Sequence, residues 1–245
     1  DALQEFFGIE AFDYNANKQK LVENLDFLKS MSVEEQTFYK KWIEVQELNN
    51  YSSRASQVKA KIWTPTDIHN ESLTIKEIQD LNPTVVHVNN KILENDWLML
   101  RTFVHTMEFA QTPGRFVKFL ITDGNLDNPR YLGVISMSSD VITITDRDKY
   151  IGWTADDKLK KKRLAHSAIG SCIMSTQPFG YNFLGGKLIA ALVTAETVRN
   201  AWQALYDQLL VGITTTSLYG SYSMYNSLKW WHKCAAGQLG SFSKT

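Results

Sequence analysis

The sequence feature that most constrains the fold is a pair of apolar, β-rich runs near the middle of the chain, Phe116–Thr122 and Tyr131–Met137. The segment between them, Asp123–Pro129, consists of residues that favour turns. Two β-rich runs joined by such a segment predict an antiparallel hairpin. We expect Val141–Ile144 to extend or follow this hairpin.

Helical patterns dominate the N-terminal part of the chain. Leu21, Leu25 and Leu28 recur at near-helical spacing. Ser32 and Glu35 have the spacing of a capping box, which starts a second helix that we expect to end at Asn49–Asn50. We therefore assign residues 1–55 to an N-terminal helical extension and residues 56–245 to one α/β domain.

The rest of the chain alternates between strand and helix patterns. Strands are predicted over residues 58–63, 84–88, 168–175 and 211–216. Helices are predicted over residues 73–81, 90–107, 156–167, 185–210 and 224–231. This order indicates the α/β (α+β) class, with a mixed sheet that is flanked by helices.

Composition limits the classes of function. No apolar run approaches the ~20 residues that cross a bilayer, so we expect no membrane contact. Cys172 and Cys234 are the only cysteines, which favours a reducing, cytoplasmic location. The five histidines lack metal-ligand spacing, so no metal site is predicted. A net charge of zero argues neither for nor against nucleic-acid binding.

A glycine pair precedes the longest predicted helix, in the segment Leu184, Gly185, Gly186 and Lys187. Unpaired amides and the positive end of the helix dipole gather at a helix start, and glycines let an anion approach the backbone. These four residues are therefore candidates for binding a phosphate or pyrophosphate group. The alternative is that the glycines only permit a tight turn from strand to helix.

Hydroxyl side chains gather at the end of the last predicted strand and just after it, and four of them are consecutive. Hydroxyls are costly to bury without partners, so this strand end indicates a binding rim. The alternative is β-propensity for the threonines and turn chemistry for the serines. The candidate substrate-binding residues are Thr214, Thr215, Thr216, Ser217, Ser221, Ser223 and Asn226.

Arg147, Asp148 and Trp153 form a third candidate group. Arg147 lies between two carboxylates and either pairs with them or orients a substrate. Trp153 either stacks on a base or closes the core. A basic run follows, which suits either phosphate-backbone contacts or a solvated helix face, and it consists of Lys160, Lys161, Lys162 and Arg163.

Five blocks occur in one order along the chain, namely Tyr131–Ile135, Arg147–Asp148, Ile151–Trp153, Leu184–Ala190 and Ile213–Gly220. That order resembles the DruA family of Druantia anti-phage systems, over about residues 130–240. The resemblance implies a phage or anti-phage context, with DNA as a partner.

The order of elements also resembles the GNAT acyltransferase fold and, distantly, the Mom DNA-modification protein of phage Mu. This resemblance implies a transferase that acts on nucleic acid. Acyl-coenzyme A, or another phosphate-containing donor, would bind at Gly185–Lys187. Tyr225 or Tyr219 would be the general acid, and Arg147–Asp148 would orient the substrate.

Two alternatives to catalysis stay open. The chain could be a non-catalytic module that binds DNA or protein in phage defence or counter-defence, which the departure at Lys187 from the GNAT glycine pattern favours. It could instead be a phage structural or interaction protein whose N-terminal helices bind a partner protein.

Overall fold

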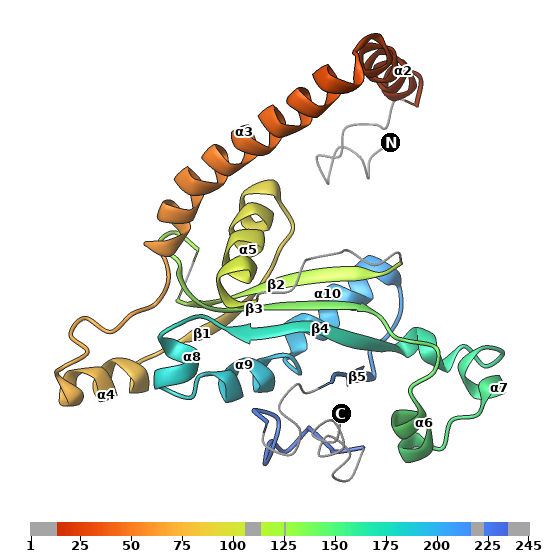
Figure 1. Ribbon diagram of the computed structural model, residues 1–245. Coiled ribbons are helices and arrows are strands. Elements are labelled where there is room, and N and C mark those ends of the chain that lie inside the picture. Colours follow the sequence, from red (N-terminus) through yellow and green to blue (C-terminus); the bar gives the residue numbers. More distant parts are fainter. Residues whose placement is uncertain (1–13, 106–113, 125, 217–222, 235–245) are drawn as a thin grey trace, which may run out of the picture. The chain divides into compact units, whose positions relative to one another are not determined.

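The computed structural model describes residues 14–105, 114–124, 126–216 and 223–234 (Figure 1). Two compact units make up the chain, Asp1–Arg54 and Ala55–Thr245. The first unit contains α2 (Tyr14–Ser30) and the greater part of α3 (Val33–Lys59). The predicted capping box is present, because Ser32 Oγ accepts from the Glu35 amide at 3.2 Å and Glu35 accepts from the Ser32 amide at 2.7 Å.

The end predicted for this second helix, at Asn49–Asn50, is wrong. Helix α3 continues to Lys59, because Ala55 and Val58 pack into a core cluster of the second unit. Tertiary burial therefore overrides the weak helix propensity of the asparagines and serines in this stretch.

The second unit is built on a five-stranded sheet in the order β1-β2-β3-β4-β5. Neighbouring strands are antiparallel from β1 to β4, and β5 runs parallel to β4. This mixed sheet with its flanking helices confirms the predicted fold class. The strands are β1 (Pro83–His87), β2 (Phe116–Asp123), β3 (Arg130–Ser139), β4 (Ser167–Ser175) and β5 (Gly212–Thr214).

The predicted central hairpin is confirmed as β2 and β3, and both of its faces are buried. On one face, Leu120 and Val134 belong to the same core cluster as Trp97 and Leu100 of α5 (Lys91–Val104). Trp97 is also fixed to the sheet, because its Nε1 donates to the Ile135 carbonyl at 3.0 Å. Figure 1 shows α5 lying along this face of the sheet.

On the other face, Phe119 and Ile135 cluster with Ile189 of α9 (Gly186–Leu192) and Trp202 of α10 (Glu196–Tyr206). Helices therefore cover both faces of the sheet (Figure 1). In the described part of the chain, no helix has the length and apolar character needed to cross a bilayer. The remaining helices are α4 (Glu71–Gln79), α6 (Thr145–Ile151), α7 (Ala155–Lys158), the 3-10 turn η1 (Arg163–His166) and α8 (Phe179–Asn182).

The single long helix predicted over residues 185–210 is wrong, because α9 and α10 meet at an extended junction. Thr194 Oγ1 donates to the Ala191 carbonyl at 2.8 Å, and Ala195 is extended, with φ −65° and ψ 151°. A Thr side chain that bonds to the backbone competes with the regular helical pattern. The junction lets each helix bury its own apolar residues, Ile189 in α9 and Trp202 in α10.

The charged helix predicted over residues 156–167 is also wrong. Only α7 and η1 form there, because Lys162 has a left-handed backbone, with φ 53°, and Arg115 donates to the carbonyls of Leu164, Ala165 and Ser167. These long-range bonds hold the segment in a tight turn against the start of β4.

Three shorter predictions fail as well. Residues 58–63 form the end of α3 and a single bridge between Ile62 and Tyr131, not a strand. Residues 141–144 are a loop that leads into α6, and residues 224–231 form turns in place of a helix. The last predicted strand is present but spans only Gly212–Thr214.

Gly133 in β3 marks a close approach between the sheet and α9. A Cβ at this position would lie 2.7 Å from the Met174 carbonyl oxygen and 2.7 Å from Ile189 Cδ1. Gly133→Ala should therefore lower the free energy of unfolding by about 1–3 kcal/mol, measured by urea denaturation. Gly212→Ala is the matched control, because a Cβ at Gly212 would have no atom within 4 Å, and it should change stability little. Equal effects at both positions would contradict this packing constraint.

Candidate functional site

A cleft of about 1710 Å³ opens beside β5 and is the candidate functional site. One wall is formed by residues 144–153, which include most of α6, and another by the α9–α10 junction at residues 193–199. Residues 210–216, which include β5, and part of the segment 223–234 complete the lining. Its volume exceeds the ~300–1,000 Å³ of a typical small-ligand pocket, so the cleft can hold a nucleotide or part of a polymer.

Aromatic and basic side chains give this cleft its chemical character. The aromatic residues of the lining are Tyr150, Trp153, Tyr225, Trp230 and Trp231. The lining also includes the basic residues Arg147, Arg163, Arg199 and Lys233, with Asp146 as the one carboxylate among the described lining residues. Rings with nearby cations suit a ligand that has both flat bases and phosphate groups.

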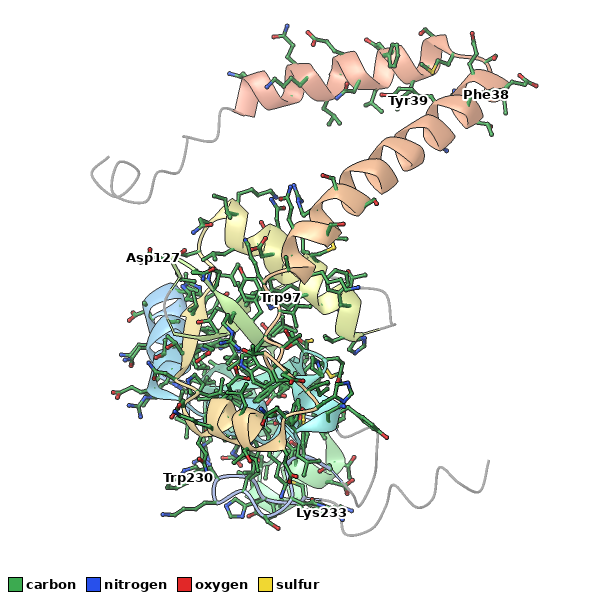
Figure 2. The ribbon with its side chains drawn as sticks, turned by 90° about the vertical axis from the view of Figure 1, so that its left-hand side faces the viewer. Phe38, Tyr39, Trp97, Asp127, Trp230 and Lys233 are labelled. Atoms are coloured by element: carbon green, nitrogen blue, oxygen red, sulfur yellow. The ribbon has the colours of Figure 1, made fainter. Side chains whose placement is uncertain are left out.

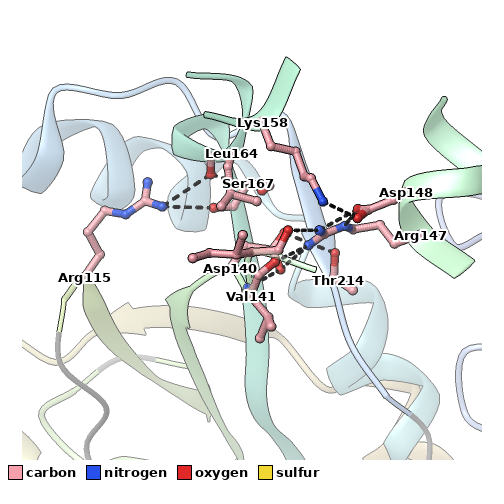
Figure 3. A network of polar contacts seen from close by, with 10 residues as sticks. Arg115, Asp140, Val141, Arg147, Asp148, Lys158, Leu164, Ser167 and Thr214 are labelled. Carbon is pink, nitrogen blue, oxygen red and sulfur yellow. Dashed lines mark hydrogen bonds and ion pairs between the residues drawn. The ribbon is translucent and has the colours of Figure 1, made fainter. Parts of the chain in front are cut away.

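The α6 wall is held by a buried guanidinium, that of Arg147 (Figure 3). It pairs with Asp140 at 2.7 Å and with Asp148 at 2.6 Å. It also donates to the carbonyls of Val141 and Ile142 at 2.9 and 3.4 Å. The side chains of Arg147 and Asp140 are 3% and 0% exposed, so this ion pair is shielded from solvent.

Two further residues extend this polar network. Lys158 of α7 pairs with Asp148 at 2.5 Å, and Thr214 of β5 donates to Asp140 at 3.3 Å. Burial raises the pKa of Asp148, but the hydrogen bonds from Lys158 and Arg147 outweigh it and leave this pKa below its ordinary value. The network therefore links the end of β3 to α6, α7 and β5.

Arg147 and Asp148 were predicted to orient a substrate, and the structure gives both of them internal partners. Their carbonyl and side-chain contacts position Trp153 instead. The Trp153 amide donates to the Asp148 carbonyl at 2.8 Å, and the Arg147 guanidinium lies 5.4 Å from the Trp153 ring centre. Gly152, between them, has a left-handed backbone with φ 78°. Trp153 is half-buried and lines the cleft.

The predicted hydroxyl-rich rim is partly placed in the cleft. Thr214, Thr215 and Thr216 line it, and Thr215 Oγ1 donates to the Gly170 carbonyl of β4 at 3.1 Å. Ser223 and Asn226 also line it, with 3.4 Å between their Oγ and Oδ1 atoms. The predicted residues Ser217, Tyr219 and Ser221 lie outside the described residues.

Tyr225, a predicted general acid, is half-buried and lines the cleft. Its ring is 4.6 Å from the Trp231 ring centre. Burial raises the pKa of Tyr225, and a hydrogen bond with Thr215 lowers it by less. A tyrosine in this environment keeps its proton at neutral pH, so it is able to donate a hydrogen bond or a proton.

The segment from Lys229 to Lys233 is a part of the site that the sequence patterns missed. Trp230, Trp231, His232 and Lys233 all line the cleft. The signal that could have found it is two adjacent tryptophans between two lysines. The sequence patterns predicted only a helix over residues 224–231 and gave Trp230 and Trp231 no place in the site.

The predicted phosphate cradle at Leu184–Lys187 does not line this cleft. The Gly185 amide donates to the Phe179 carbonyl at 3.0 Å, and the Lys187 amide donates to the Leu184 carbonyl at 3.3 Å. A Cβ at Gly185 would lie 2.3 Å from the Phe179 ring, so this glycine is required for packing. The turn's geometry fits this packing role better than a pyrophosphate cradle, and an acyl-coenzyme A or other phosphate-containing donor stays a prediction.

The predicted basic run is largely neutralised by its own neighbours. Lys160 pairs with Asp156 at 3.1 Å, and Lys161 pairs with Asp157 at 3.0 Å. Arg163 also approaches Asp157, at 3.4 Å, and is the one member of the run that lines the cleft. Lys162 is exposed.

The structure is that of a mixed α/β protein with a cleft lined by aromatic and basic side chains. Residues 34–244 match the family model described as Druantia protein DruA, so the chain belongs to this family. The Druantia protein DruA of Escherichia coli (strain UMEA 4076-1) is 26% identical over 161 residues, which cover 61% of this chain and 39% of that relative. The match therefore spans about two fifths of the relative's length. No solved structure matches the chain.

Because the network is buried, removing the Arg147 guanidinium should destabilise the fold strongly. Arg147→Met leaves Asp140 buried without its charged partner and leaves Asp148 with Lys158 alone, so it should lower the free energy of unfolding by about 3–5 kcal/mol in a urea titration at neutral pH. Lys160→Met, which removes only an exposed pair, should cost less than about 1 kcal/mol.

The difference in unfolding free energy between the wild type and Arg147→Met should depend on pH. The pKa of Asp148 is lower in the folded protein than in the unfolded chain. The ionised carboxylate therefore stabilises the fold at pH values above the unfolded pKa, and this stabilisation is lost as the pH falls through the folded pKa. The stability difference between wild type and Arg147→Met should therefore narrow in acid. A stability difference that stays constant down to acid pH would contradict the ion pair between Arg147 and Asp148.

Proposed function

We propose that this protein acts in anti-phage defence by binding nucleic acid in the cleft beside β5. The observation that carries the proposal is the lining itself, in which aromatic rings are interspersed with basic side chains. Membership of the family of the Druantia protein DruA supports the defence context. A cytoplasmic location, where phage nucleic acid is found, fits this role and stays a prediction.

The distribution of charge between the two units supports an anionic ligand for the second unit. The chain is neutral as a whole, but the second unit has 20 Lys and Arg against 16 Asp and Glu, a net charge of +4. The first unit has 6 against 10, a net charge of −4. The unit that contains the cleft is therefore positively charged, which favours association with a polyanion.

Neutralising exposed cations of the cleft tests this proposal. Arg199→Gln combined with Lys233→Gln should weaken DNA binding and reduce the slope of log K against log salt concentration by about 1–2, measured by fluorescence anisotropy. Lys91→Gln is the control, because Lys91 is an exposed cation of α5 away from the cleft lining. DNA binding that is unchanged in the double variant would place the contact elsewhere.

A second candidate function, group transfer to a nucleic-acid base, is favoured by the order of the strands. The antiparallel strands, the glycine-opened α9 and the parallel β5 match part of the order that the GNAT resemblance implies, whereas turns replace the final helix that would carry the Tyr. Tyr225 lines the cleft and is protonated at neutral pH, which a general acid must be before it gives up its proton. Trp153 would stack on a base that leaves its duplex.

Mass spectrometry of nucleosides distinguishes transfer from binding alone. DNA incubated with the protein in a host-like extract should contain a nucleoside of new mass, and Tyr225→Phe should abolish it while DNA binding persists. Tyr181→Phe, at an exposed tyrosine of α8, is the matched control. A nucleoside profile that the wild-type protein does not change would exclude the transferase and leave the binding function standing.

A further inference from the structure

Trp230 lines the cleft, and the residue that follows it, Trp231, is anchored to the core. Trp231 Nε1 donates to the Ala190 carbonyl of α9 at 2.9 Å, and its ring packs on Tyr225. Trp230, the preceding residue, is 69% exposed. The turn therefore holds the Trp231 indole against the core and leaves the Trp230 indole largely exposed, with Lys229 Nζ over one face of its ring, 4.9 Å from the centre.

A second exposed ring lines another wall of the same cleft. Tyr150 of α6 is 56% exposed, and its ring stacks on His232 with 6.2 Å between centroids and an interplanar angle of 25°. This contact joins the α6 wall to the segment that carries Trp230. Two exposed aromatic side chains thus belong to one lining, although they come from distant parts of the sequence.

Two lysines flank this aromatic segment, and neither is neutralised by the residues that the structure describes. Among those residues, Lys229 and Lys233 form no ion pair with a carboxylate. Figure 2 shows Trp230 and Lys233 at the same end of the second unit, far from the buried Trp97. The segment therefore combines a stacking surface with cations that can approach phosphate groups.

We propose that the cleft binds single-stranded nucleic acid, with a base stacked on Trp230 and the adjoining phosphates near Lys229 and Lys233. This inference rests on the proposed nucleic-acid function and specifies the form of the strand. The faces of bases are accessible in a single strand, whereas a duplex covers them, so exposed rings favour the single strand. Three of the four residues in the basic run that could follow a duplex backbone, Lys160, Lys161 and Arg163, are paired with Asp156 or Asp157.

Anisotropy titrations with three labelled probes test the inference on the full chain. The probes are a single strand of ~15 nucleotides, a blunt duplex of the same length and an abasic strand of the same charge. The wild-type protein should bind the single strand about tenfold or more tighter than the other two, because only this probe offers free bases for stacking. Trp230→Ala should weaken single-strand binding about tenfold and leave duplex and abasic binding within about twofold.

Two controls keep the result interpretable. Trp230→Phe retains a ring and should recover most of the single-strand affinity, which covers the case in which Trp230→Ala does not fold. Tyr181→Ala removes another exposed ring, 85% exposed on α8, and should have no effect. Two results would overturn the single-strand inference and leave nucleic-acid binding intact. One is a wild-type protein that binds the duplex more tightly than the single strand. The other is a Trp230→Ala variant that loses affinity equally for all three probes. Failure of the wild-type protein to bind any probe would overturn both proposals.

Discussion

The buried guanidinium of Arg147 is the interaction on which the candidate site depends. Through Asp140, Asp148, Lys158 and Thr214 it connects the end of β3 with α6, α7 and β5. Such a network is costly when any member is missing, because a buried charge then lacks its partner. The four segments are therefore held in one arrangement, and the cleft wall that carries Trp153 has a defined position before any ligand arrives.

The separation of β5 from β4 explains why a cleft forms at this edge of the sheet. The two strands pair only over Ser167–Ile169 and Gly212–Thr214. At the next position the Thr215 side chain, not its backbone, bonds to the Gly170 carbonyl, so the ladder ends while a β4 acceptor stays satisfied. Beyond this point, Tyr225 and Trp231 pack against the core cluster that contains Ile189 of α9. Thr215 at this hydroxyl-rich strand end therefore completes the hydrogen bonding of β4 and also lines the cleft.

The elements that sequence patterns predicted correctly are those with local causes. The central hairpin follows from two β-rich runs and a turn, and the capping box at Ser32 follows from the spacing of two residues. The break at Thr194 and the turn at Lys162 were missed, because long-range contacts and backbone bonds by side chains decide them. The cleft itself could be predicted only in part. Trp153 and the threonines were identified, whereas Trp230 was not, because a helical pattern explained the same residues.

The neutral net charge of the chain does not show where its unpaired cations lie, for a related physical reason. Several carboxylates of the second unit are used within its own structure, since Asp140 and Asp148 hold Arg147 while Asp156 and Asp157 neutralise the run at Lys160. Cations without such partners in the described part of the chain, notably Lys229 and Lys233, flank the aromatic segment of the cleft. A count of charges treats all of these groups as equal, whereas the field at the cleft depends on which of them remain unpaired. The arrangement of ion pairs, more than the composition, therefore determines where positive charge is left unpaired on the surface of the second unit.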